Sequence, residues 1–160
     1  MGIELNILDL IDDMILINAN ATDWKEAVRL AGKLLVENSR AKESYVEAMI
    51  KVTEELGPYA VIAPGIAIPH ARPEDGALKP GFSIVVLRKP VNFGSHNDPV
   101  YIVIGFTAVD KTSHLRALQI LATLISDEEF KNRIINAASK EEVKEIIWEY
   151  VERLLRNSSR

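Results

Sequence analysis

The side chains best suited to chemistry in this sequence are two histidines, His70 and His114, together with Arg72. His70 lies within residues 63–73, where each of three prolines fixes φ and a glycine lets the backbone approach its neighbours closely. A residue that precedes proline favours an extended conformation, so the pattern predicts a stiff, extended segment that presents His70. An imidazole with one nitrogen donating to a carbonyl offers a lone pair on the other nitrogen, which suits nucleophilic chemistry or proton transfer. The structural alternative is a partly buried loop histidine that is hydrogen-bonded to the backbone.

His114 stands where a helix is expected to begin, because Thr112 or Ser113 can cap a helix that follows. The first turn of a helix has free backbone amides and the positive end of the helix dipole, so it attracts anions. An exposed polar residue in a first turn is an equally good interpretation of this spacing. Together with His70, His114 predicts a phosphate or oxyanion site in which His114 donates to the anion.

Arg72 follows His70 by two residues and offers a planar fork of donors that matches a phosphate group. The alternative for Arg72 is a surface ion pair with Glu74 or Asp75. From the residue type and its spacing alone, the ion pair is the preferred interpretation of Arg72.

Composition and charge exclude several classes of function. The chain has 160 residues, of which 48% are hydrophobic and 26% are charged, so we expect one globular domain spanning residues 1–160. Its net charge of −4, with basic and acidic residues interleaved, argues against a nucleic-acid partner. The sequence contains no cysteine, and the start Met1-Gly2-Ile3-Glu4 lacks the layout of a signal peptide. No apolar run approaches the roughly 20 residues that span a bilayer, and we expect a cytoplasmic protein.

Familiar catalytic motifs are also missing from the sequence. It has no His-x-x-x-His pair for zinc, no Gly-x-Ser-x-Gly elbow and no Gly-x-x-x-x-Gly-Lys loop for nucleotides. By elimination, the residues favour covalent chemistry at His70 on an anionic group, with no metal or cofactor.

Hydrophobic periodicity predicts helices at both ends and strands in the middle. Three pairs resemble capping boxes, in which two side chains satisfy free amides at a helix start. They are Asp23 with Glu26, Ser44 with Glu47, and Ser139 with Glu142. The expected helices are 3–13, 24–38, 45–56, 113–125, 127–138 and one from 140, and the expected strands are 14–17, 59–63, 66–68, 82–87 and 100–106. This order indicates an α/β (α+β) fold with a single mixed β-sheet of about five strands flanked by helices.

The region around His70 resembles a known family. Residues 57–74 look like the signature of enzyme IIA domains of the bacterial sugar phosphotransferase system, in the mannitol/fructose superfamily, type 2. Residues 90–94, 97–100 and 108–110, together with His114, extend the resemblance over nearly the whole chain. The resemblance implies the mannitol-type enzyme IIA fold, a mixed sheet flanked by helices.

The resemblance also implies a role. Such a domain accepts a phosphoryl group from the phosphocarrier protein HPr on one histidine. It passes the group to a IIB component of a sugar permease, whose IIC component lies in the membrane. By position, His70 matches the phosphorylated histidine and His114 the second active-site histidine. No cofactor is required, because charged side chains and helix-end amides balance the phosphate.

Within this family, the residues around His70 are most similar to those of the ascorbate-type IIA proteins. Mannitol and fructose members usually carry an arginine upstream of the active histidine, near the place where this sequence has Glu54. Arg72, directly after the histidine, is more typical of the ascorbate type. We expect Arg72 and Ser113 to bind the phosphate.

Both protein partners must reach His70 in turn, so the surface around it is expected to be shallow and partly apolar. Ile66, Ile68 and Leu115 are the candidates for this surface. Two other functions remain open from the sequence. One is a regulatory domain of the same fold whose phosphorylation state a partner reads, and the other is a hydrolase that uses His70 and His114.

Overall fold

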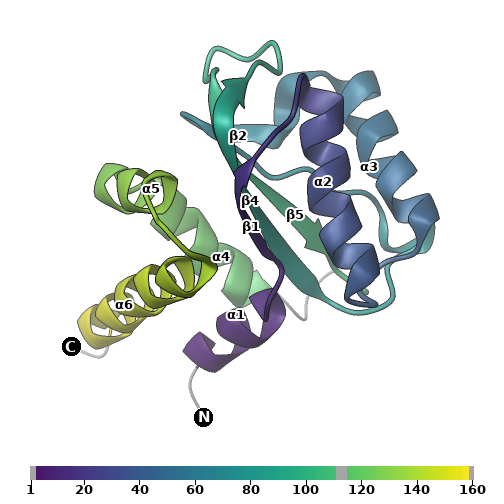
Figure 1. The fold of residues 1–160 in the computed structure, drawn as a ribbon. Helices are drawn as coiled ribbons and strands as arrows, with labels where there is room; N and C mark the ends of the chain where they lie inside the picture. The colour runs from purple at the N-terminus through teal and green to yellow at the C-terminus, as the bar shows by residue number, and fades with distance from the viewer. Residues whose placement is uncertain (1–2, 111–114, 159–160) are drawn as a thin grey trace.

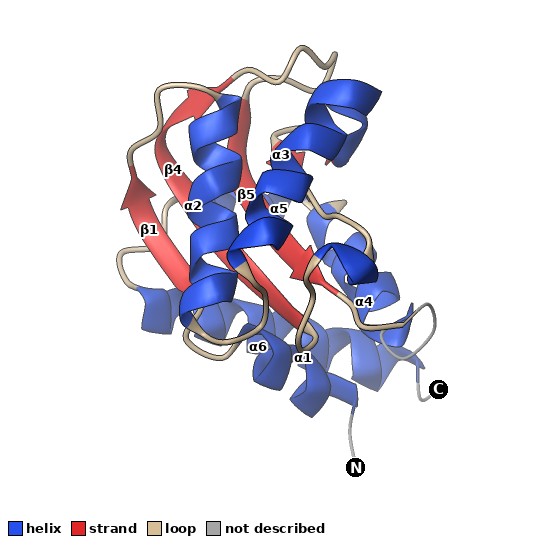
Figure 2. Ribbon diagram, turned by 90° about the vertical axis from the view of Figure 1, so that its right-hand side faces the viewer, coloured by secondary structure: helices blue, strands red, loops and turns tan. Residues whose placement is uncertain are grey.

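The computed structural model describes residues 3–110 and 115–158, in which helices pack against a sheet (Figures 1 and 2). The elements follow in chain order as α1 (Ile3–Ile11), β1 (Ile15–Ala19), α2 (Trp24–Glu37), α3 (Glu43–Leu56), the 3-10 turn η1 (Pro58–Ala60), β2 (Val61–Ala63), β3 (Ile66–Ala67), the 3-10 turn η2 (Pro73–Asp75), β4 (Gly81–Val91), β5 (Val100–Thr107), α4 (Leu115–Ile125), α5 (Glu128–Ile135) and α6 (Lys140–Ser158). No helix in the described ranges is long and apolar enough to cross a membrane.

The strands of the described chain form one five-stranded sheet in the order β1-β4-β5-β3-β2. Strands β4 and β5 pair antiparallel and form its centre, whereas β1 runs parallel to β4 and β3 runs parallel to β5. After β2 the chain turns at Pro64 and Gly65 into β3, which pairs antiparallel with β2. Gly65 adopts a positive φ of 81°, which suits glycine. The predicted mixed sheet of about five strands is confirmed.

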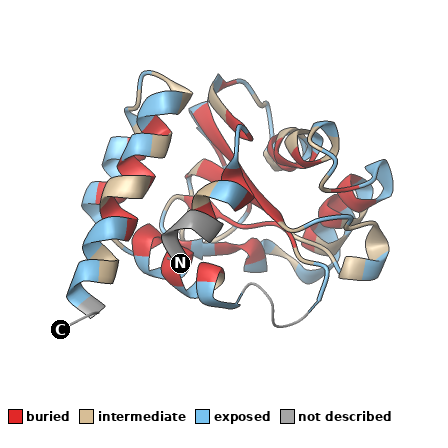
Figure 3. Cartoon of the chain, turned by 90° about the horizontal axis from the view of Figure 1, so that it is seen from below, coloured by how far each residue is buried: buried red, intermediate tan, exposed pale blue. Residues whose placement is uncertain are grey.

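Helices cover both faces of the sheet, as Figure 1 shows: α2 and α3 lie on one face, and α1, α4, α5 and α6 lie on the other. Side chains alternate along a strand, so β4 serves both layers. Val85 packs beneath α2 and α3, and its neighbours Ile84 and Val86 pack on the opposite face. Seen from below, buried residues follow the strands and the inner sides of the helices (Figure 3).

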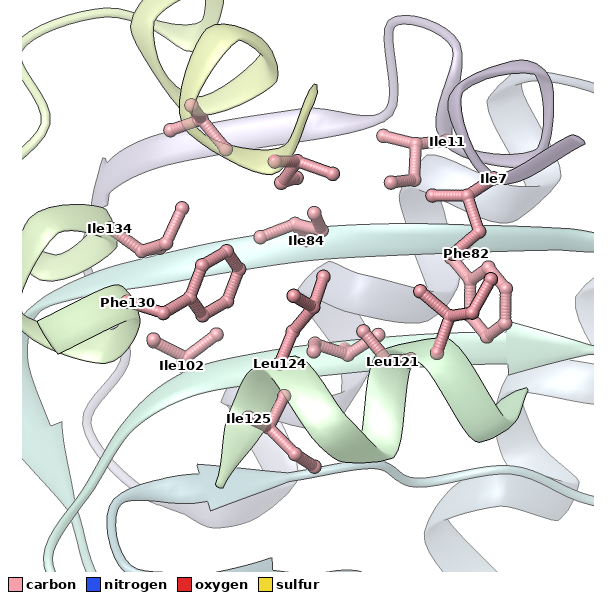
Figure 4. Packing of buried hydrophobic residues seen from close by; sticks show 14 of the residues in the cluster. Ile7, Ile11, Phe82, Ile84, Ile102, Leu121, Leu124, Ile125, Phe130 and Ile134 are labelled. Carbon is pink, nitrogen blue, oxygen red and sulfur yellow. The ribbon is translucent and has the colours of Figure 1, made fainter. Parts of the chain in front are cut away.

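The layer beneath α4, α5 and α6 is almost entirely aliphatic and aromatic (Figure 4). Phe82 stacks on Phe106 with ring centroids 5.0 Å apart, and Phe130 meets Tyr150 edge to face at 5.2 Å. The first contact joins β4 to β5 and the second joins α5 to α6, and rings of this size bury large apolar areas. This layer closes one face of the sheet next to the strand that leads to His70.

Local capping signals set the starts of several helices. The Asp23 side chain accepts a hydrogen bond from the backbone amide of Glu26 and so caps α2, as its sequence predicts. Ser139 accepts in the same way from the amide of Glu142 before α6, while the Glu142 carboxylate accepts from the amide of Ala138. Asp23 and Ser139 thus cap their helices as predicted, but the Glu side chains do not complete the boxes in the described contacts, because Glu26 accepts from the Thr22 hydroxyl and Glu142 accepts from Ala138.

The capping box predicted for Ser44 and Glu47 is wrong. Helix α3 begins two residues earlier than predicted, at Glu43, and its cap position is Lys42. Ser44 therefore lies inside the first turn, and its hydroxyl donates to the carbonyl of Asp75 at 3.0 Å. A tertiary contact to the chain beyond His70 has replaced the expected local one.

Candidate functional site

His70 lies three residues beyond β3, on a segment that continues in the direction of that strand. The amide of Ile68 donates to the carbonyl of Ala60 at 2.8 Å, which holds this segment against the chain that enters β2. The Nδ1 atom of His70 lies 3.1 Å from the carbonyl oxygen of Ile68. A carbonyl only accepts, so Nδ1 carries the proton and Nε2 carries the lone pair. The structure thus supplies the backbone acceptor that the sequence led us to expect.

Two aromatic rings fix the orientation of the half-buried His70 ring. Tyr59 of η1 meets it edge to face with centroids 5.9 Å apart, and Phe106 of β5 meets it at 6.1 Å. The sequence did not single out either ring. Tyr59 lies within residues 57–74, which carry the family resemblance, so the sequence could have pointed to it. The place of Phe106 depends on the pairing of β3 with β5.

Arg72 forms an ion pair with Asp75. Its Nε and Nη2 atoms lie 3.4 and 3.3 Å from the two carboxylate oxygens, and its backbone amide donates to the same carboxylate at 3.1 Å. The Arg72 side chain is 72% exposed. The hydrogen bond from Arg72 lowers the pKa of Asp75, and in return Asp75 raises the pKa of Arg72. The ion pair expected as the alternative is therefore present, and phosphate binding by Arg72 stays a prediction.

His114 and Ser113, the other predicted site residues, lie outside the described residues. The described chain leaves β5 at Thr107, directly after the ring of Phe106 that contacts His70. It resumes at Leu115, the first residue of α4. The roles of His114 and Ser113 remain predictions.

The apolar surface predicted around His70 is only partly correct. Ile66 and Ile68 are buried in the layer beneath α4, α5 and α6, because residues two apart in an extended segment share one face and here that face is covered by these helices. Leu115 is 51% exposed, and Tyr59 beside His70 is also exposed. The prediction that Ile66 and Ile68 contribute to a docking surface is wrong.

The turn that precedes His70 is held from two sides. Lys131 of α5 is buried, donates from Nζ to the carbonyl of Pro64 at 3.0 Å, and forms an ion pair with Glu128. On the other side, the amide of Gly65 donates to the carbonyl of Asn97 at 3.0 Å. No local pattern points to Lys131, because its partner lies 67 residues away.

Metal-ligating side chains do not gather in the part of the chain that the structure describes: no three His, Cys, Asp or Glu residues there could hold one ion. The chemistry available at His70 is that of an imidazole held through Nδ1 by a carbonyl, so that Nε2 is the nitrogen left to react. Such a group suits nucleophilic attack or proton transfer.

Residues 10–150 match a protein family described as the phosphoenolpyruvate-dependent sugar phosphotransferase system, EIIA 2. The mannitol-specific cryptic phosphotransferase enzyme IIA component of Escherichia coli K12 is 38% identical over 128 residues, which is 80% of this chain and 87% of that protein. The ascorbate-specific EIIA component of the same organism is 41% identical over 133 residues, covering 82% of this chain and 86% of that protein.

Solved structures agree with the fold. The solution structure of the mannitol-specific cryptic enzyme IIA from Escherichia coli gives a TM-score of 0.80 at 35% identity, covering 89% of this chain and 98% of that one. The mannitol enzyme IIA from Escherichia coli, solved in complex with phosphorylated enzyme IIB, gives 0.73 at 29% identity, covering 92% and 96%. The expected mannitol-type enzyme IIA fold is confirmed.

The Arg72–Asp75 pair predicts how stability depends on pH. The pKa of Asp75 is lower in the folded protein than in the unfolded chain, so ionised Asp75 stabilises the fold above the unfolded pKa of about 4. This contribution is lost as the pH falls through the folded pKa. Asp75→Asn removes the charge, so we expect the variant to be less stable than wild type near neutral pH, with the difference vanishing in acid. Urea denaturation from about pH 2 to about pH 7 measures it.

Glu74→Gln is the matched control, because it neutralises the neighbouring carboxylate, for which the structure shows no hydrogen bond to Arg72. It should change the pH dependence less than Asp75→Asn does. A stability difference between wild type and Asp75→Asn that stays constant across this pH range would contradict the role given to the charge.

Proposed function

This chain belongs to the EIIA 2 family of the phosphoenolpyruvate-dependent sugar phosphotransferase system, and we propose that His70 is the residue on which it carries the phosphoryl group. A phosphotransferase component of this system accepts the group from phosphorylated HPr and transfers it to a IIB component during sugar uptake. The contact between Nδ1 of His70 and the Ile68 carbonyl carries the proposal, because it leaves the Nε2 lone pair as the nucleophile.

The transfer consists of two displacements at phosphorus. In the first, Nε2 attacks the phosphoryl group of phosphorylated HPr in line, a P–N bond forms, and the donor imidazole departs with the electron pair of its own P–N bond. In the second, a nucleophile of IIB attacks the same phosphorus and Nε2 of His70 departs. Transition states of this kind are loose, so positioning and charge stabilisation supply most of the catalysis.

Charge stabilisation is assigned to Arg72, Ser113 and His114. Asp75 engages Nε and Nη2 of Arg72, so the Nη1 hydrogens are the donors that we assign to the phosphate. His114 and Ser113 are assigned as further donors to the phosphoryl oxygens. The exposure of Arg72 supports this role, because a donor on the surface can meet a group that arrives with a partner protein.

The substrate class that we propose is ascorbate or a related sugar acid. The ascorbate-specific relative supports it, and so does Glu54. Where mannitol and fructose members usually carry an arginine, Glu54 forms an exposed ion pair with Lys25 at 2.8 Å. A negative charge cannot take over the role of an arginine toward phosphate. Arg72 is therefore the arginine that we assign to the site.

We further propose that residues 1–160 act as a single enzyme IIA domain in the cytoplasm. Contacts between α1 and α6 support the first point, since they join elements from opposite ends of the chain. The cytoplasmic location is supported by the source of the phosphoryl group, because phosphoenolpyruvate is an intracellular metabolite.

The decisive experiment is incubation with phosphoenolpyruvate, enzyme I and HPr, followed by intact-mass spectrometry. Wild type should gain one acid-labile phosphate, and His70→Ala should gain none, because it lacks the nucleophile. His96→Ala is the matched control, since His96 is exposed in the loop before β5 and should leave labelling intact. Labelling that persists in His70→Ala would show that another residue is the nucleophile.

His114→Ala separates acceptance of the phosphoryl group from its onward transfer. The variant keeps His70 and should still be labelled by phosphorylated HPr. It lacks a donor to the phosphoryl oxygens, so its transfer to IIB should slow by about 10²- to 10³-fold, the usual loss for one transition-state donor. Rapid-quench transfer to purified IIB measures this rate. A rate equal to that of wild type would remove His114 from the mechanism.

The choice of IIB partner tests the substrate class. Phosphorylated protein should transfer its label faster to an ascorbate-type IIB than to a mannitol-type IIB at equal concentrations. The two IIB proteins are matched controls for each other, because both measurements use the same labelled donor. A preference for the mannitol-type IIB would overturn the ascorbate assignment and leave the role of His70 untouched.

A further inference from the structure

Tyr45 lies in the first turn of α3, and its hydroxyl contacts the backbone of two residues next to His70, namely Ala71 and Phe106. Its side chain is buried, with 1% of the residue exposed. Its hydroxyl oxygen lies 3.1 Å from the amide nitrogen of Ala71, the residue directly after His70. The same oxygen lies 2.7 Å from the carbonyl oxygen of Phe106, whose ring contacts His70.

The directions of these hydrogen bonds follow from the groups involved. A phenol has one proton, and two carbonyl oxygens lie within reach of it, that of Phe106 at 2.7 Å and that of Ala71 at 3.2 Å. The shorter contact assigns the proton to Phe106, and the Tyr45 oxygen accepts from the amide of Ala71. Burial raises the pKa of Tyr45 to about 12, which keeps the proton in place near neutral pH. Tyr45 therefore acts as donor and acceptor at once.

The contacts join three parts of the chain that the sequence keeps far apart. Tyr45 is 26 residues from Ala71 and 61 residues from Phe106. Ala71 lies beyond the end of β3, so no strand partner fixes it there. Its amide bond to Tyr45 fixes the backbone between the two side chains assigned to phosphate chemistry, His70 and Arg72.

Other contacts near Ala71 do not replace Tyr45. The Ser44 hydroxyl and the amide of Lys42 bind Asp75 and Gly76, which lie after Arg72. The Ile68 amide binds Ala60, before His70. Between Ile68 and Arg72, Tyr45 is the group that the described contacts show bonded to a backbone amide.

We propose that Tyr45 is a positioning residue for phosphoryl transfer. Its hydroxyl holds the backbone of Ala71 against the end of β5, and this keeps the His70 ring between Tyr59 and Phe106 with Nε2 free for the incoming phosphorus. The inference rests on the proposed function of His70. Tyr45 itself is buried and does not touch the phosphoryl group.

The test is Tyr45→Phe, which keeps the ring and removes the hydroxyl. Single-turnover transfer from saturating phosphorylated HPr should slow by about 10- to 100-fold, because small displacements of a reacting group cost rates of that order. The dissociation constant for HPr should change little, since Tyr45 is not on the surface. Nitrogen NMR of His70 should show a lower population of the tautomer protonated at Nδ1, a change that a purely structural role would not produce.

Ser83→Ala is the matched control. Ser83 is also buried, and its hydroxyl donates to the backbone carbonyl of Ala31 at 2.8 Å, on the same face of the sheet as Tyr45 but in contact with α2. It should lower the melting temperature as Tyr45→Phe does, and yet keep the wild-type transfer rate and His70 tautomer. If Tyr45→Phe also keeps both, the hydroxyl serves stability alone and the proposal is overturned.

The outcomes distinguish this inference from the proposed function. Absence of label on His70 of the wild type overturns both, whereas a labelled His70 with equal rates in wild type and Tyr45→Phe overturns only the role of Tyr45. If Tyr45→Phe does not fold, para-aminophenylalanine at position 45 replaces it. That residue still donates to the carbonyl of Phe106 but accepts poorly from Ala71, so a reduced transfer rate supports the proposal and a wild-type rate overturns it.

Discussion

The parallel pairing of β3 with β5 is the contact on which the site depends. Strand β3 contributes only two residues, with Ile66 opposite Ile102 and Ala67 opposite Val103. Such a short pairing has little stability of its own. It persists because β3 lies between β5 and β2, and because Ile66 is buried beneath the C-terminal helices. Once this register is set, the chain after β3 runs beside the end of β5 and His70 meets Phe106.

Polar side chains from separate elements then stiffen this arrangement. Lys131 binds the turn that precedes β3, and Tyr45 binds the backbone that follows His70. Both side chains are buried, and a buried partner left without its hydrogen bond costs about 1–3 kcal/mol. The half-buried histidine thus sits on a short stretch whose two ends are anchored by buried side chains. That combination suits a nucleophile that must hold its orientation and still receive two protein partners in turn.

Much of the fold could be predicted from the sequence, because its signals are local. Asp23 caps α2 through an amide three residues away, and the runs 82–87 and 100–106 fall within β4 and β5. Predictions failed where a distant contact replaced a local one. Ser44 bonds to Asp75 in place of capping α3, and Ile66 and Ile68 are buried because they share the face of the sheet that the C-terminal helices cover.

For the site, the sequence by itself determined His70 as the candidate nucleophile, the stiffness of the segment around it, and the nearness of Arg72 to Asp75. Proline, glycine and residues two or three positions apart restrict one another whatever the rest of the chain does. Only the tertiary structure decided which rings flank His70 and that Tyr45 and Lys131 hold its segment. These partners lie far away in the chain, and strand register and helix packing, which no local pattern encodes, bring them together.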